Sequence, residues 1–300
     1  MAYELVYTSA ERGLKPGTRG FCTVACTRGM PPQTMQLLEA LSAYKNLYGM
    51  RESSHADGPV AWSHIISNFV GRRVNVLSRV GATSPDHTGR SNKLAHHIVL
   101  SLAERVPGGP AWLSSQEGLF MDTWADEPHY IEAQRRVPTG DYTEGRADAW
   151  EALTGDAGHA ALLPQMFLEK PDRIVYIIFA PGTEMLPLVS ESLALLEPMR
   201  RWQVTYNTYF VSLTAGSTCA WRCCIQDSDA HREALRDHRG VILDLTQPLP
   251  APSGQLADLA RNGWGKADAL PLRQEPAKKS SFVVMGSRNI NQLNLKPRLK

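Results

Sequence analysis

A short apolar run near the middle of the chain places the tightest limit on its fold. Residues 174–180, IVYIIFA, are apolar at every position and are followed by Pro181 and Gly182. Strands that are covered on both faces have this pattern, whereas strands with one solvent-exposed face alternate apolar and polar residues. Helix-like segments flank the run, and further strand-like and helix-like segments follow it up to about residue 248. This order predicts an α/β unit over residues 146–250.

The first 145 residues have a different pattern. Two strand-like segments are joined by a loop rich in Gly and Pro, a helix-like segment follows, and a second hairpin comes next; they lie at residues 3–10, 21–27, 29–49 and 60–83. The segment 92–106 fits either a strand or a helix. The layout predicts an α+β N-terminal domain over residues 1–145, packed with the α/β C-terminal unit.

Beyond residue 250 the composition changes again. Residues 272–300 carry many Lys and Arg side chains against the single acid Glu275. Segments that are poor in apolar residues and rich in one charge do not bury enough surface to order themselves. Residues 251–300 are therefore predicted to form a basic, largely disordered tail with a helical turn or two near its start.

The bulk composition describes a soluble globular protein. Of 300 residues, 43% are hydrophobic and 21% are charged, and the net charge is +2. This balance gives no reason to expect nucleic acid as a partner. No apolar run approaches the roughly 20 residues that a membrane helix needs, and the opening MAYELVYTSAERG is unlike a signal peptide. A cytoplasmic protein is expected.

The cysteines and the short motifs indicate neither a metal nor a cofactor. The five cysteines are irregularly spaced, which favours small buried core residues over a zinc site or a disulfide scaffold. The segment FAPGTE joins a strand to a helix, but neither a P-loop nor a dinucleotide fingerprint is present. Asp227, Asp229 and His231 could bind a metal, although Asp229 is more simply read as a helix cap.

The most polar segment of the first domain is GRSNKLAHH, residues 89–97. Arg90 and Asn92 alternate onto one side of an extended chain, and Asn92 shares a face with His96 in a strand or a helix. These side chains could hold an anionic or strongly polar group. With Ser91 or Asn92 beside His96, the same corner could perform hydrolysis.

Two further readings of the polar residues stay open. His96 could be a structural histidine that is buried against a backbone partner. The segment YTSAERG offers Thr8, Ser9 and Arg12 where the first strand meets its loop, a common place for function. Ser and Thr also close turns with their own hydroxyl groups, so these residues could be structural as well.

The opening YTSAERGLKPGTRGFCTVACTRGMPPQTMQLLEALSAYKNLY resembles the N-terminal domain, type two, of the bacterial GTPase-associated proteins. The likeness includes the YTSA strand end, the GF strand start, the GMPP turn and the leucine-rich helix that closes on Tyr44. GRSNKLAHH is similar to a second hallmark of that family, an Asn followed by an Ala-His pair. VTYNTY, residues 204–209, is similar to a strand of its middle region.

The resemblance implies a partner or scaffold of GTPases, without an assigned catalytic mechanism. An adaptor or regulatory component of a bacterial NTP-dependent conflict or signalling system is therefore expected, with a GTPase or its associated proteins as partners. The binding candidates are Thr8, Ser9, Arg12, Arg90, Ser91, Asn92 and His96. A hydrolase or nucleotide-processing enzyme that uses the His/Ser/Asn corner is the alternative. Because longer family members exist, whether a further C-terminal domain or membrane segment follows stays open.

Overall fold

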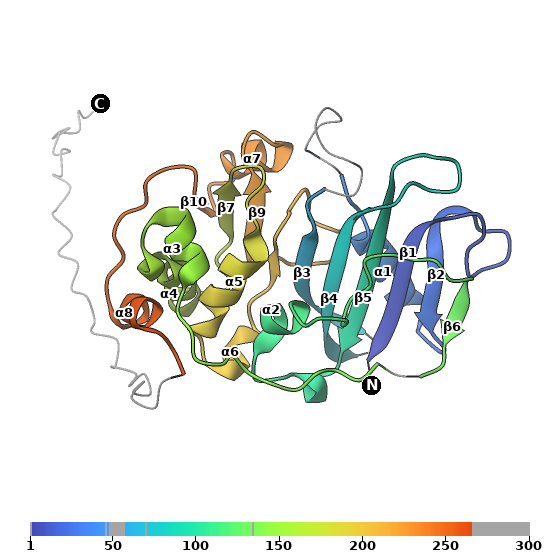
Figure 1. Cartoon of the computed structure of the whole chain (residues 1–300), viewed down its shortest axis with the longest axis horizontal. Helices are drawn as coiled ribbons and strands as arrows, with labels where there is room; N and C mark the ends of the chain where they lie inside the picture. Colours follow the sequence, from blue (N-terminus) through green and yellow to red (C-terminus); the bar gives the residue numbers. More distant parts are fainter. Residues whose placement is uncertain (1, 46, 48–57, 70, 134, 266–300) are drawn as a thin grey trace, which may run out of the picture. The chain divides into compact units, whose positions relative to one another are not determined.

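A mixed sheet organises the computed structural model, which describes residues 2–45, 47, 58–69, 71–133 and 135–265 (Figure 1). Its ten strands lie in the order β10-β7-β9-β8-β3-β4-β5-β1-β2-β6. The strands are β1 Tyr3–Ala10, β2 Gly20–Thr27, β3 Ala61–Phe69, β4 Arg72–Thr83, β5 Asn92–Leu100, β6 His129–Ile131, β7 Val175–Phe179, β8 Tyr206–Asn207, β9 Trp221–Ile225 and β10 Val241–Asp244. The helices are α1 Pro32–Leu41, α2 Gly109–Ser114, α3 Asp148–Thr154, α4 Leu162–Glu169, α5 Met185–Ala194, α6 Pro198–Arg201, α7 Asp229–Ala234 and α8 Gln255–Asn262, with 3-10 turns η1 Leu102–Glu104 and η2 Ala157–Ala161.

Strands β1 to β5 form the antiparallel half of the sheet, in the order β3-β4-β5-β1-β2. Alternate residues point to opposite faces, as the pleat requires. Leu5 and Val99 pack with Leu38 of α1 on one face. Leu77 and Ile98 point to the other face, where the segment 101–137 with α2 covers them. The segment 92–100 is therefore a strand, which settles the choice between strand and helix.

Strands β8, β9, β7 and β10 form the parallel half. Every residue of β7 is buried, as the apolar run predicts. Val175, Ile177 and Phe179 share a core cluster with the α5 side chains, whereas Tyr176 and Ile178 share another with α7. Helices thus cover both faces of this half, and the α/β reading of the C-terminal unit is confirmed.

The two halves are joined within the sheet. Strand β8 runs antiparallel to β3, with Ser63 opposite Asn207. Trp202, just before β8, is fully buried among the N-terminal core residues, and its Nε1 donates a 2.7 Å hydrogen bond to Val106 O. The α+β unit and the α/β unit are therefore packed together as expected, across a shared core.

The two helix-like segments that flank the apolar run of β7 are each divided. The segment 148–169 becomes α3, η2 and α4, because Gly155 adopts a left-handed φ of 81° at the end of α3 and Asp156 then caps η2. The segment 183–202 becomes α5 and α6. Pro198 opens the second helix because a proline fits a first turn but not a helix interior.

The region predicted as a basic tail begins with an ordered helix. Within residues 251–265, helix α8 packs on η2, and Arg261 pairs with Asp156 at 2.6 Å. Residues 266–300 of the predicted tail, and residues 46 and 48–57 beyond α1, lie outside the described residues. None of the described helices has the length and apolarity to cross a membrane.

Candidate functional site

Asn92, the first residue of β5, fixes the end of the neighbouring strand β1. Its side-chain Oδ1 accepts hydrogen bonds from the backbone N–H groups of Ser9 at 3.1 Å and Lys93 at 2.8 Å. The Thr8 hydroxyl lies 3.2 Å from the same oxygen and donates to Lys93 O at 2.8 Å. Thr8 and Ser9 are buried. Three of the predicted site residues therefore converge in one rigid corner.

Asp86, in the loop between β4 and β5, completes this corner. It accepts hydrogen bonds from the hydroxyl groups of Thr88 at 2.6 Å and Ser9 at 3.0 Å, and from the Arg90 backbone N–H at 3.1 Å. The hydrogen bond from the Thr88 side chain is the largest cause that holds the pKa of Asp86 far below its usual value. The carboxylate therefore stays charged, and Arg90 lies 3.6 Å from it as an exposed ion partner.

A cleft of about 610 Å³ opens beside the corner. Thr8, Ser9, Arg12 and Asn92 all line it. Across the cleft, the Glu127 carboxylate forms an ion pair with the Arg12 guanidinium at 2.7 Å. Both side chains are largely exposed. This volume is within the usual range for ligand sites, but the cleft is open and charged at its rim. We call it the polar cleft.

His96 lies on the same face of β5 as Asn92 but outside the polar cleft. Four residues of extended strand separate the two by about 13 Å. His96 is fully buried: its Nε2 lies 2.8 Å from Glu4 Oε1, and its Nδ1 accepts from the Met121 backbone N–H at 2.9 Å. Burial is the main cause that lowers its pKa. The imidazole is therefore held neutral under the segment that follows α2.

Glu4 also has a cationic partner, because the Arg135 Nη2 lies 2.7 Å from its carboxylate. Burial raises the pKa of Glu4, but the hydrogen bonds from His96 and Arg135 outweigh it and hold the pKa below 4.5. Arg135 also donates to the carbonyl groups of Gly118 and Leu119. This network fastens the covering segment onto the sheet and leaves His96 no open side.

Of the other candidates, Arg90 and Ser91 are exposed and do not line the polar cleft. No hydrogen bond joins Ser91 to His96 within the described part of the chain. The cleft also contains residues that the sequence did not single out, chiefly Asp86, Trp124 and Glu127. The Asp-x-Thr spacing at residues 86–88 could have indicated a side-chain turn. Glu127 and Trp124 come from a distant loop and gave no such signal.

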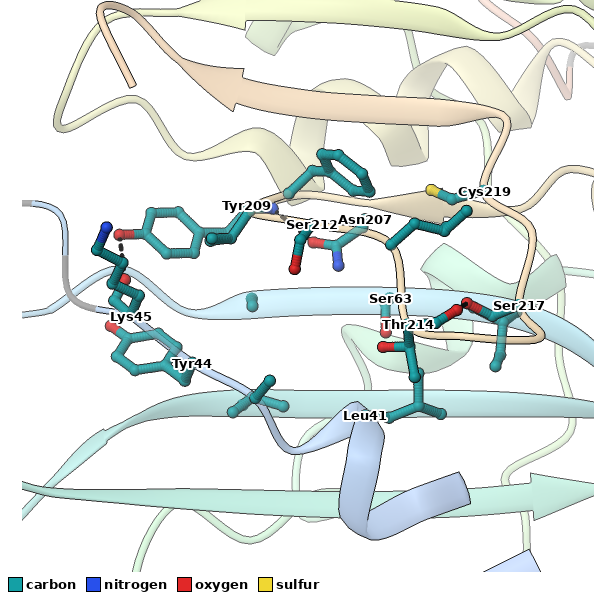
Figure 2. A pocket seen from close by; sticks show the side chains of 17 residues that line it. Leu41, Tyr44, Lys45, Ser63, Asn207, Tyr209, Ser212, Thr214, Ser217 and Cys219 are labelled. Atoms are coloured by element: carbon teal, nitrogen blue, oxygen red, sulfur yellow. Dashed lines mark hydrogen bonds between the residues drawn. The ribbon is translucent and has the colours of Figure 1, made fainter. Parts of the chain in front are cut away.

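A second cavity, of about 170 Å³, lies between the end of α1 and the loop after β8 (Figure 2). The Tyr209 hydroxyl donates to Lys45 O at 3.0 Å and accepts from the Leu47 N–H at 2.9 Å. Its ring stacks on Tyr44, with the centroids 5.7 Å apart. Figure 2 shows these aromatic groups at one end and the Thr214–Ser217 turn at the other. The cavity is smaller than a typical ligand site.

The possible metal ligands after β9 are committed to other contacts. Ser228, rather than Asp229, caps α7 through the His231 N–H, which corrects the helix-cap prediction. Asp229 pairs with Arg232 and Lys45, and His231 Nδ1 accepts from the Asp227 N–H. Within residues 2–265 that are described, no group of three or more potential ligands surrounds a cation site. All five cysteines are buried and unpaired, as expected of core residues.

Family models match most of the chain. Residues 1–137 match the N-terminal domain, type 2, of GTPase-associated protein 1, and residues 147–247 match the middle domain of the same protein. The corner formed by Thr8 and Asn92 falls in the first match, and the parallel strands fall in the second. No curated protein and no solved structure matches the chain. The chain belongs to the GTPase-associated protein family, with a type 2 N-terminal domain followed by a middle domain.

Proposed function

We propose that this chain is an adaptor or regulatory component that binds a GTPase, or the partners of a GTPase. It would act in the cytoplasm, in a bacterial NTP-dependent conflict or signalling system. Membership of a family described as GTPase-associated supports this role. The partner would dock at the polar cleft, through protein–protein contacts and without nucleic acid.

The observation that carries the proposal is the charged rim on a rigid base. Arg12 and Glu127 keep 70% and 85% of their side chains exposed although they pair with each other. An exposed pair of this kind contributes little to folding, so its charges can exchange for those of a partner at small cost. Beneath it, Asn92 holds the two strand ends in place. Hydrogen-bonded strand ends below exposed charges at the rim suit recognition of another protein.

The hydroxyl groups of the cleft favour binding over catalysis. Thr8 donates to a backbone carbonyl, Lys93 O, which cannot accept a proton as a general base. Ser9 donates to Asp86, and the hydrogen bonds to this carboxylate hold its pKa far below the usual value, so it is a weak base. A serine or threonine nucleophile needs a neighbouring general base within about 3 Å. The buried environment of His96, bound to Glu4 and to a backbone N–H, argues against its use as that base.

The test is co-purification with the GTPases encoded beside this protein, followed by an affinity measurement at several salt concentrations. Arg12→Glu should weaken binding by about ten-fold or more, because a reversed charge at an interface repels its partner. Arg28→Glu is the matched control, since Arg28 is also exposed and paired with a glutamate, Glu132, but does not line the cleft. Failure of every neighbouring GTPase to bind, or equal effects of the two variants, would contradict the proposal.

A further inference from the structure

A third cavity, of about 750 Å³, lies at the junction of the two sheet halves. It is separate from the polar cleft and is lined by the last residues of β3, the approach to β8 and the start of β9. Thr205 and Arg222 share one face of the sheet, because Arg222 pairs with Asn207, two residues after Thr205, and both Thr205 and Arg222 line the cavity. Residues from both matched regions therefore build this cavity, which we call the junction cavity.

Arg222 is the unusual residue of the junction cavity. It is 8% exposed, and no carboxylate lies within ion-pair distance of it in the described part of the chain. Its guanidinium carbon lies 5.0 Å from the centre of the Phe210 ring and 5.2 Å from that of the Tyr176 ring, so it packs against both aromatic groups. Tyr176 in turn donates to Asp237, so one tyrosine side chain lies between Arg222 and this carboxylate. A buried charge without a direct counterion is costly.

Most of the hydrogen-bonding capacity of Arg222 is unused. Nε donates to Cys219 O at 3.0 Å and Nη1 donates to the Tyr176 hydroxyl at 2.8 Å. A guanidinium carries five N–H donors. Three of them, including both on Nη2, have no acceptor among the described residues. The two anchored donors hold the group in place, and the remaining ones are those that would bind a ligand.

Thr205 supplies a second unused donor in the same cavity. It is 6% exposed, and its Oγ1 accepts a 2.9 Å hydrogen bond from the Ala220 N–H. A hydroxyl group that accepts can still donate its own proton. No acceptor for this proton is found in the part of the chain that the structure describes. Two nearly buried side chains thus present donors without acceptors, which indicates a ligand rich in acceptor atoms.

The rim of the junction cavity adds positive charge. Arg73 at the start of β4 lines it, is exposed, and forms no ion pair with a described residue. Asp172 is the only acidic residue of the lining, so two arginines face one carboxylate. Water could satisfy the free donors but would leave this charge uncompensated. An oxyanion would satisfy both, and phosphate matches the guanidinium fork with two parallel hydrogen bonds.

We propose that the junction cavity binds a small molecule that carries a phosphate monoester. Arg222 grips two phosphate oxygens, Thr205 donates to one of them, and Arg73 supplies the second positive charge at the entrance. The cavity is larger than a free phosphate ion needs, so the remaining volume holds the organic part of the ligand. The site is independent of the polar cleft, and its ligand would bind across the two domains of the chain.

The test is isothermal titration of the full chain at constant ionic strength with glycerol 2-phosphate, inorganic phosphate and glycerol. The ester should bind, glycerol should not, and the comparison with inorganic phosphate distinguishes an ester site from a site for the free ion. Arg222→Lys keeps the charge but loses the fork and should weaken binding about ten-fold or more. Arg73→Gln changes an exposed side chain and should weaken binding several-fold.

Arg28→Gln is the matched control, because it removes an exposed arginine far from the cavity lining and should leave binding unchanged. If Arg222→Lys does not fold, Arg73→Gln decides the outcome alone. The proposal is overturned if neither phosphate compound binds above the level of glycerol. It is equally overturned if Arg73→Gln and Arg28→Gln reduce binding to the same extent.

Discussion

We predict that mild acid destabilises this fold, because His97 is buried in its neutral form. Its Nε2 lies 2.9 Å from the Ser42 hydroxyl, and that hydroxyl donates to Leu38 O, so Nε2 must carry the proton. Nδ1 then accepts from the Ser78 hydroxyl at 2.8 Å. Both ring positions are matched to the neutral imidazole. Burial lowers the pKa of His97 to about 3.

The size of the effect follows from proton linkage. The unfolded chain binds a proton at His97 below its ordinary pKa of 6.5, whereas the folded chain does not until about pH 3. Stability is therefore present above pH 6.5 and is lost as the pH falls. Between pH 6.5 and pH 5 the loss is about 2 kcal/mol for this residue. The loss of stability at pH 5 depends only on the pKa of His97 in the unfolded chain, because the pKa in the folded chain lies far below pH 5. His64, with its pKa lowered to about 4 by burial, adds a loss of the same sign.

Urea unfolding at pH 7, 6 and 5 would measure this loss. The parent chain should lose at least about 4 kcal/mol between pH 7 and pH 5, because His64 and His97 together supply that much and the lowered pKa of His96 adds a loss of the same sign. His97→Gln, which cannot be protonated, should lose about 2 kcal/mol less over the same interval. His238→Gln changes an exposed histidine and should behave as the parent does. An unchanged slope in His97→Gln, or a parent that loses under 1 kcal/mol, would refute the reasoning.

Three further substitutions have clear structural expectations. Trp150→Ala removes a fully buried ring whose Nε1 donates to Leu188 O, and should cost about 3–5 kcal/mol in a denaturant titration. Asp156→Ala removes the partly exposed ion pair with Arg261 and should increase amide hydrogen exchange in α8 before any other helix, at a cost of about 1 kcal/mol. Gly109→Ala would place a methyl group 2.7 Å from the Arg201 Cβ at a φ of 81°, so its melting temperature should fall by several degrees.

Much of the fold could be predicted because the strand patterns are local. The apolar run of β7 indicated a strand covered on both faces, and alternation indicated the antiparallel hairpins of the first domain. Helix ends were predicted less well. Gly155 and Pro198 divide segments whose apolar spacing is helical throughout. The left-handed φ of Gly155 ends one helix, and Pro198, which lacks a backbone N–H, cannot continue the other, so the apolar spacing alone does not determine where these helices end.

The site was only partly predictable, because burial depends on segments distant in sequence. The spacing of Asn92 and His96 correctly put both on one face of a strand. It could not show that Phe120, Met121 and Arg135 would cover His96: the Phe120 ring packs 5.3 Å from the imidazole, and Arg135 bonds Glu4 beside it. The convergence of Thr8 with Asn92 likewise depends on the β1–β5 register, which a single strand pattern does not determine.

We predict that the two sheet halves fold as one cooperative unit although each matches its own family model. The reason is Trp202, which belongs to the C-terminal half of the sequence but fills the core between β4, β5 and α2.

A fragment of residues 1–145 would lose this indole, the hydrogen bond to Val106 and the β8 partner of β3. An indole removed from a core costs about 3–5 kcal/mol, which is a large share of the 5–15 kcal/mol that stabilises a typical domain. The full chain should therefore unfold in one transition that is the same by tryptophan fluorescence and by far-UV circular dichroism, and the fragment should lack a cooperative transition. Two separate transitions in the full chain, or a fragment as stable as the whole chain, would contradict this prediction. Either result would show that the N-terminal domain is stable without the Trp202 side chain.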